Sequence, residues 1–171
     1  MSTQNKIETN KADFSIRPAN SNDAGLILDF IKKLAEYEKL SHEVSATEEM
    51  ILTQLFGPNP AAEAIIGEFN GKPVAFAVFF STFSTFLSQP GMYLEDLFVL
   101  PEHRGSGFGK VVLSYLAKLA VDRNYGRLEW CVLNWNEPAI EFYRSLNTEE
   151  QNEWTVHRLS DNTLSALAEK F

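Results

Sequence analysis

Three glycines at alternate positions, Gly105, Gly107 and Gly109, lie in a short segment whose chemistry suits an anion. Glycine has no Cβ, so a ligand can approach the backbone closely and the chain can adopt positive φ angles. An amphipathic helix is predicted to begin here, and the unpaired N–H groups at a helix start attract phosphate. Arg104 and Lys110 flank the glycines and add positive charge. The pattern predicts a phosphate site, and the alternative is a strand-to-helix turn without a ligand.

The spacing of these glycines separates the loop from two other phosphate-binding motifs. A Walker loop needs Gly-Lys followed by Ser or Thr, and the dinucleotide fingerprint is Gly-x-Gly-x-x-Gly. Here the glycines alternate with Ser106 and Phe108, and the loop follows an apolar strand predicted at 93–99. A position between a strand and a helix favours the anion site over the turn without a ligand.

Two adjacent carboxylates, Glu95 and Asp96, interrupt the apolar strand at 93–99. Neighbouring residues of a regular strand point to opposite faces. Both carboxylates therefore face one cleft only if a bulge interrupts the alternation. Their place between apolar residues favours a functional role over that of two charges on an edge strand.

The elements that must position these residues follow from hydrophobic periodicity and turn signals. Alternation predicts strands, a spacing of three and four predicts helices, and Asn70-Gly71 predicts a tight hairpin turn. An early antiparallel meander followed by a strand-helix-strand-helix segment predicts one α+β domain over 14–171, built on a mixed sheet, after a polar N-terminal tail at 1–13. The predicted strands are 14–17, 64–69, 74–80, 93–99, 128–133 and 154–159, and the predicted helices are 24–35, 47–55, one with its apolar stripe at 111–119, 137–146 and 163–170.

Composition limits the classes of partner. The chain has 171 residues, a formal net charge of −8 and a single cysteine, Cys131. A net negative charge disfavours the binding of nucleic acid, whose phosphates are also negative. No apolar run approaches the roughly 20 residues of a membrane span. One cysteine forms neither an internal disulfide nor a multi-cysteine metal site, which fits the cytoplasm. Cys131 is expected in the core, and His157 receives no catalytic role because no nucleophile is paired with it.

The segment Arg-x-x-Gly-x-Gly, between a strand and a helix, resembles the acetyl-CoA loop of the GNAT acetyltransferases. Other segments resemble the spermidine/spermine (diamine) acetyltransferase branch of that family, and these matches cover most of the chain from 14 to 159. They are IRPA at 16–19, LAEYE at 34–38, YLEDLFV at 93–99 and WNEPAIEFY at 135–143. The resemblance implies an α+β fold in α/β/α layers, with a mixed, mostly antiparallel sheet and flanking helices.

The resemblance also implies an acetyl-CoA-dependent N-acetyltransferase that uses no metal and joins both substrates in a ternary complex. Cofactor binding is assigned to Arg104, Gly105, Ser106, Gly107, Phe108, Gly109 and Lys110, to the backbone of Leu97 and Val99, and to Asn136 and Tyr143. Substrate binding is assigned to Tyr37, Glu38, Glu95 and Asp96, and catalysis to Tyr143 and Glu95.

Each assigned role answers a need of acetyl transfer, and each has a simpler alternative. Tyr143 would protonate the departing thiolate, whose thiol has a pKa of ~8.5, although its helical stripe also suits packing. Glu95 would hold the amine and accept its proton through water, because a carboxylate of pKa ~4.3 is a poor direct base for an alkylammonium of pKa ~10.4. Asn136 suits a helix cap, and Tyr37 with Glu38 equally suits a solvated helix end.

The resemblance leaves the acceptor open. Asn134 stands where the polyamine branch has an acid, so polyamines and lysine-like amino acids such as thialysine remain alternatives. A protein or peptide amine is a second hypothesis, and a non-catalytic coenzyme-binding module is a third. The resemblance further implies a homodimer, whereas composition and charge predict a cytoplasmic protein without nucleic-acid or membrane partners.

Overall fold

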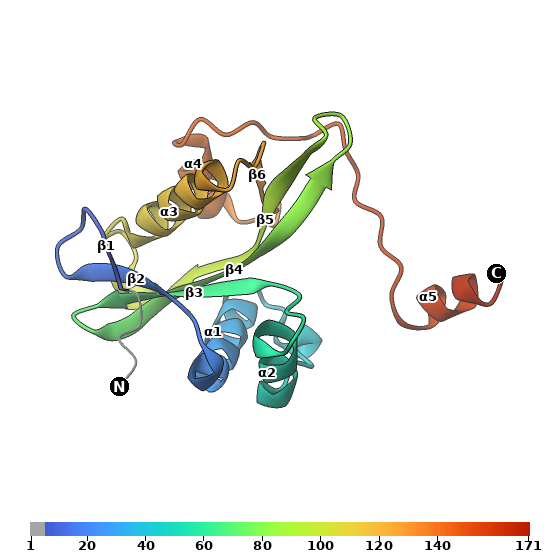
Figure 1. The fold of residues 1–171 in the computed structure, drawn as a ribbon, viewed down its shortest axis with the longest axis horizontal. Helices are drawn as coiled ribbons and strands as arrows, with labels where there is room; N and C mark the ends of the chain where they lie inside the picture. Colours follow the sequence, from blue (N-terminus) through green and yellow to red (C-terminus); the bar gives the residue numbers. More distant parts are fainter. Residues whose placement is uncertain (1–5) are drawn as a thin grey trace. The chain divides into compact units, whose positions relative to one another are not determined.

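The computed structural model describes residues 6–171, and a six-stranded sheet organises the first part of the chain (Figure 1). The strands lie in sequence order, and neighbours are antiparallel except for the parallel pair β5–β6. The predicted turn at Asn70-Gly71 joins β3 to β4, with both residues at positive φ. The mixed, mostly antiparallel sheet is confirmed. The bounds are β1 Ile7–Glu8, β2 Phe14–Pro18, β3 Glu63–Phe69, β4 Lys72–Ser84, β5 Gln89–Val99 and β6 Leu128–Glu129.

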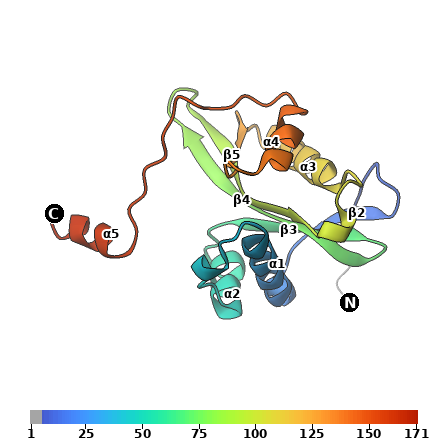
Figure 2. The ribbon, with the colours of Figure 1, turned by 180° about the vertical axis from the view of Figure 1, so that it is seen from behind.

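Helices cover both faces of this sheet. Helices α1 and α2 lie on one face and α3 lies on the other, as Figure 1 and the opposite view in Figure 2 both show. Thr47 caps α2 by accepting a hydrogen bond from the Met50 N–H at 3.2 Å. The predicted α/β/α layering is confirmed. The bounds are α1 Ala24–Tyr37, α2 Glu48–Phe56 and α3 Phe108–Asp122, with short 3-10 helices at Ser21–Asp23, Ser41–Glu43 and Pro101–His103.

Aromatic contacts hold a helix to each face of the sheet. On the α1 face, Phe30 stacks on Phe76 with ring centroids 5.1 Å apart, and Phe98 meets Phe30 edge-on. On the opposite face, Phe14 of β2 stacks on Phe108, the first residue of α3, at 4.2 Å and 5° between the ring planes. Phe108 therefore anchors the start of α3 to the sheet. The buried cluster on the α1 face comprises Ala24, Ile27, Phe30, Ile51, Ala64, Ile66, Phe76, Val78 and Phe98.

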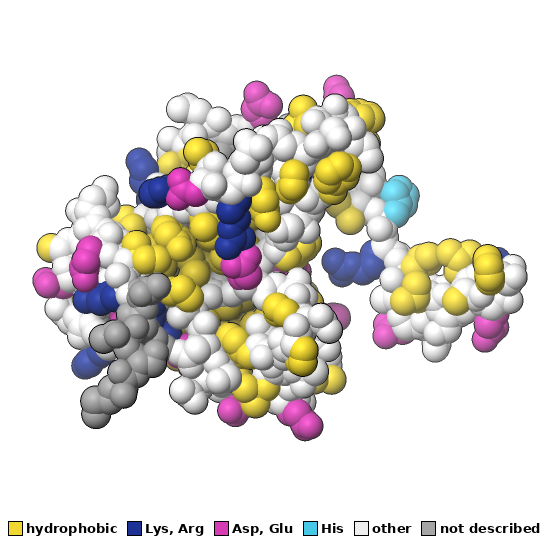
Figure 3. Space-filling model, viewed as in Figure 1, with side chains coloured by type: hydrophobic (Ala, Val, Ile, Leu, Met, Phe, Trp, Pro, Cys, Tyr) yellow, Lys and Arg dark blue, Asp and Glu magenta, His cyan; other side chains and the backbone are white. Residues whose placement is uncertain are grey.

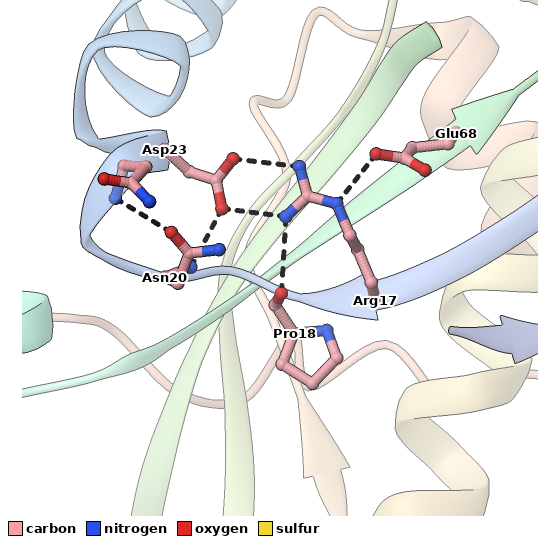
Figure 4. Close-up of polar contacts among 6 residues, drawn as sticks. Arg17, Pro18, Asn20, Asp23 and Glu68 are labelled. Atoms are coloured by element: carbon pink, nitrogen blue, oxygen red, sulfur yellow. Dashed lines mark hydrogen bonds and ion pairs between the residues drawn. The ribbon is translucent and has the colours of Figure 1, made fainter. Parts of the chain in front are cut away.

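A buried ion-pair network ties β2, β3 and the start of α1 together (Figure 4). The Arg17 guanidinium donates two hydrogen bonds of 2.8 Å to Asp23 and one of 2.7 Å to Glu68. The Asp23 carboxylate also accepts a hydrogen bond from the Asn20 N–H at 2.8 Å. Burial alone would raise the pKa of the Asp23 carboxyl, but the bonds from Arg17 and Asn20 lower it overall. Arg17 and Asp23 therefore stabilise the fold only while both are charged, because either buried charge without its partner would destabilise it.

The chain divides into two compact units, Met1–Cys131 and Val132–Phe171. The second unit contains α4, Glu137–Arg144, and α5, Asp161–Ala168. Within the predicted polar tail, the described part includes strand β1. The prediction of a single domain over 14–171 stays a prediction. None of the helices in residues 6–171 has the length and apolarity to cross a membrane.

Two sequence expectations in the C-terminal part are wrong. The predicted strand at 154–159 has no regular structure, and Trp154 and Val156 are 75% and 78% exposed. The strand predicted at 128–133 ends at Glu129, and Cys131 is exposed rather than in the core. Alternation describes how a strand would pack, but a strand also needs a partner, and no described strand pairs with 154–159.

We expect Asp23→Asn to lower the free energy of unfolding by about 3 kcal/mol, because it leaves the buried Arg17 charge without its bidentate partner. Urea denaturation monitored by circular dichroism measures this change. Asp122→Asn is the matched control, because Asp122 pairs with Lys118 on the surface of α3, where an ion pair contributes less than about 0.5 kcal/mol. Equal stability of the two variants would contradict the structural role of the buried network.

Candidate active site

A β-bulge at Glu95 organises the predicted carboxylate pair. In the β4–β5 register Asp96 lies opposite Val78 and Leu94 lies opposite Phe79, so Glu95 is an extra residue without a partner. Directly opposed residues of an antiparallel pair share a face, and Val78 belongs to the buried cluster beneath α1. The bulge therefore directs Asp96 toward the α1 face, whereas a regular strand would keep it on the face of Leu94. The sequence analysis made a shared cleft for the two carboxylates conditional on a bulge, and the structure contains one at this position.

Three carboxylates interact at this position. Burial and, to a smaller extent, the nearby negative charges of Glu95 and Glu38 together raise the pKa of the half-buried Asp96 to about 6. Glu38 caps the C-terminal end of α1, where burial raises the pKa of its carboxyl too. Glu95 is exposed. The cluster concentrates negative charge that an organic cation would neutralise, and among residues 6–171 no group of three or more acidic, His or Cys side chains is suited to a metal ion.

Arg104 joins the glycine loop, residues 104–110, to the end of α1. Its guanidinium lies 4.3 Å from the ring centroid of Tyr37 and 5.2 Å from that of Phe98. Its Nε donates a hydrogen bond of 3.0 Å to the Val99 carbonyl. Such stacking of a cation on aromatic rings is worth about 0.5–1 kcal/mol at an exposed site. Arg104 thus directs its side chain toward α1, and it brings the predicted substrate residue Tyr37 next to the predicted cofactor loop.

The outer edge of β5 presents the backbone of Leu97 and Val99. The Leu100 N–H donates to the Val74 carbonyl of β4 at 2.9 Å. Because backbone groups alternate direction along a strand, the N–H and C=O groups of Leu97 and Val99 point away from β4. In the described chain β6 pairs with β5 only at Met92 and Tyr93. An extended ligand with amide groups would fit this edge as an added strand does.

The glycine loop has the backbone of an anion cradle. Gly105 and Gly107 have φ angles of 76° and 84°, which L side chains rarely adopt. Gly107 is the N-cap of α3, and a Cβ on Gly105 would meet no atom within 4 Å. A Cβ on Gly109 would make only an ordinary contact of 3.8 Å with Val99. Packing therefore does not demand glycine at 109, whereas conformation demands it at 105 and 107.

The first turn of α3 supplies the hydrogen-bond donors of this cradle. The first intrahelical bond runs from the Val111 N–H to the Gly107 carbonyl at 3.1 Å, so the preceding N–H groups of the helix have no partner within it. Ser106 and Lys110 are exposed beside them, and Phe108 is buried. Donors and open space in this arrangement suit the oxygens of a pyrophosphate, as in acetyl-CoA.

The second unit contains the other two predicted site residues. Asn136 is buried at the N-cap of α4, and its carbonyl accepts hydrogen bonds of 3.0 Å from the N–H groups of Ala139 and Ile140. Its side chain makes no capping hydrogen bond, contrary to the sequence expectation. Tyr143 is half-buried near the end of α4, with its ring 5.2 Å from that of Phe142.

Sequence reasoning missed one residue beside the cradle. The Cε and Nζ atoms of Lys11 lie 3.1 and 3.2 Å from the position of a Cβ on Gly107. Lys11 belongs to the segment predicted as a polar tail. No sequence signal connects it with the loop, because the two are almost one hundred positions apart.

Residues 30–147 match the family model described as the Acetyltransferase (GNAT) family. The chain is 34% identical over 170 residues to a thialysine N-epsilon-acetyltransferase of Sus scrofa, covering 93% of this chain and 99% of the relative. It is 28% identical over 197 residues to an L-ornithine N5-acetyltransferase of Arabidopsis thaliana, covering 89% and 86%. Among solved structures, an integron cassette protein from V. cholerae matches with a TM-score of 0.78 and 25% identity, covering 92% of this chain and 98% of that one.

We expect the Asp96 carboxyl of the folded protein to titrate near pH 6 in a carbon-detected NMR titration. Glu95→Gln should lower this pKa by removing a neighbouring negative charge, yet most of the shift should remain because burial is the larger cause. The folded state binds this proton more tightly than the unfolded chain, whose pKa is ~3.9. Stability should therefore rise as the pH falls through about 6, and Asp96→Asn should remove that rise. An ordinary Asp96 midpoint would contradict the burial.

Proposed function

Because the chain belongs to the acetyltransferase (GNAT) family, we propose that it transfers the acetyl group of acetyl-CoA to a primary amine of a small cationic substrate. The carboxylate cluster of Glu38, Glu95 and Asp96 carries the proposal, because it lies in the same compact unit as the glycine loop. The acceptor class is a diamine or polyamine, or an amino acid with an amine-bearing side chain. Relatives named for thialysine and ornithine support the amino-acid alternative.

The carboxylate cluster attracts the ammonium form of the substrate and accepts its proton. The pKa of an alkylammonium, ~10.4, exceeds that of an ordinary Glu by about 6 units, and each unit corresponds to about 1.4 kcal/mol. The difference from the pKa of Asp96 is only about 4 units, since the pKa of Asp96 is about 6. We therefore assign proton acceptance, through a water relay, to Asp96 as well as to the sequence candidate Glu95. Glu95, which is exposed, would hold the arriving cation.

The coenzyme would lie along two features of the first unit. The N–H groups of the loop would bind the pyrophosphate, and the outward backbone of Leu97 and Val99 would pair with the pantetheine amides. When bound, acetyl-CoA supplies an acetyl group activated as a thioester. The protein's part is to place the carbonyl of that group against the amine, and such orientation accounts for a large share of the rate in two-substrate reactions.

Tyr143 is the proposed acid. A phenol with a pKa of ~10 is protonated at neutral pH, and a departing thiolate whose thiol has a pKa of ~8.5 benefits from a nearby proton donor. Its half-buried position on α4 is compatible with this role. Asn136, buried at the start of the same helix, is the proposed contact to the pantetheine arm.

We also propose a cytoplasmic homodimer. Apolar side chains remain uncovered along the C-terminal segment, and Figure 3 shows them gathered on α5. They include Leu164, Leu167 and Phe171, and uncovered apolar surface of this kind commonly marks an interface. Sedimentation equilibrium that returned a monomer would overturn the dimer.

Thiol release from acetyl-CoA should be seen with at least one small amine in a panel of diamines, polyamines, ornithine, lysine and thialysine. Because the carboxylate cluster attracts positive charge, we expect amines with one positive charge and an otherwise uncharged structure to be poorer acceptors than substrates with a second cationic group. If no amine of the panel stimulated thiol release although the protein still bound coenzyme, the small-amine proposal would be excluded.

Tyr143→Phe should lower kcat by about 100-fold with little change in the Kd for CoA, because it removes a proton donor and keeps the ring. Steady-state kinetics with the best amine of the panel measure this. Tyr125→Phe is the matched control, since the Tyr125 hydroxyl hydrogen bonds to Ser81 at 2.6 Å and has no assigned role in the reaction. Equal kcat values for the two variants would contradict the acid assignment.

A further inference from the structure

Lys11 reaches the start of α3 from the turn between β1 and β2. Its Nζ atom lies 3.2 Å from the position that a Cβ would occupy on Gly107, the N-cap of the helix. The ammonium group is therefore in contact with the loop that forms the anion cradle. Among residues 6–171 outside the loop, no other lysine lies within 4 Å of the Cβ position of Gly105, Gly107 or Gly109.

The turn that carries Lys11 is held by several hydrogen bonds. The Thr9 hydroxyl donates to the Phe14 carbonyl at 2.6 Å, and it accepts a bond from the Lys11 N–H at 3.2 Å. The Phe14 N–H donates to the Lys11 carbonyl at 3.2 Å, and the Asn70 N–H donates to the Asp13 carbonyl at 2.9 Å. The turn is thus fastened both to β2 and to the β3–β4 hairpin.

The same anchor places the turn and the cradle. Phe14 ends the turn, Phe108 begins α3, and their rings stack at 4.2 Å. Because one aromatic contact fixes both segments, the backbone of Lys11 keeps its place beside the loop.

The positive charge of the exposed Lys11 lies beside the positive end of the α3 dipole. A helix N-terminus carries a partial positive charge, so a cation there is repelled. Within the described residues Lys11 forms no ion pair, whereas Lys6 on the same segment pairs with Glu8 at 3.3 Å. Two positive groups, the ammonium and the helix start, converge on one position beside Gly107. A ligand phosphate would relieve the repulsion between them.

We propose that Lys11 binds the pyrophosphate of the coenzyme, as a clamp that the N-terminal hairpin contributes to the cradle. The inference rests on the proposed function for the identity of the anion. It adds a binding residue from outside the glycine loop.

Isothermal titration calorimetry with CoA tests this on the intact chain. Lys11→Gln should raise the Kd for CoA about fivefold at low ionic strength, which is the change in affinity expected from the loss of one exposed charge pair. Lys6→Gln, which makes the same charge change on the same segment, should leave the Kd unchanged. The difference between the two variants should shrink as salt is raised, because exposed charges are screened. Equal affinities of both variants for CoA would overturn the role of Lys11.

Dephospho-CoA, which lacks the 3′-phosphate, identifies the phosphate concerned. The penalty of Lys11→Gln should persist with this ligand if the contact is to the pyrophosphate, and its disappearance would overturn that assignment. Failure of the unaltered protein to bind CoA would overturn the coenzyme proposal itself. Thermal unfolding of each variant without ligand shows whether the hairpin still folds, and an Lys11→Arg variant should retain the affinity if charge is what matters.

Discussion

An extra residue in β5 is the constraint on which the candidate site depends. Glu95 has no partner in β4, so pairing resumes at Asp96 with the two faces of the strand exchanged. The exchange turns Asp96 toward the face that α1 covers, where the C-terminal end of that helix contributes Glu38. Burial and like charge then raise the pKa of Asp96 to about 6. One inserted residue and one helix end thus give β5 a carboxylate of raised pKa, which is the property that its proposed role toward an amine requires.

The loop beside this cluster combines an open backbone with firm attachment. Its glycines take φ angles that other residues rarely adopt, and conformational freedom of that kind would normally loosen a segment. Here Arg104 stacks on Tyr37 toward the α1 face, while Phe108 stacks on Phe14 toward the opposite face. The loop is therefore held from both sides of the sheet. A rigid cradle binds an anion without the entropy cost of ordering it.

Much of the fold and part of the site were predictable from the sequence, because the signals are local. Asn70-Gly71 predicted a hairpin turn, and Thr47 marked the start of a helix, since each acts within a few residues. The strand expected at 154–159 was wrong because a strand exists only with a partner, and alternation is silent about partners. Cys131 was misplaced in the core for the same reason, since the strand predicted to bury it ends two residues earlier.

By itself the sequence determined the chemical inventory: glycines that permit positive φ, paired carboxylates, a tyrosine, and the family signature that connects them with acetyl transfer. Tertiary structure alone decided which of these groups meet. It placed Glu38 near Asp96, turned Arg104 onto Tyr37, and brought Lys11 against Gly107. The reason is that strand register and face are set by pairing and packing between distant segments, and one residue more or less in a strand reverses every side chain that follows it.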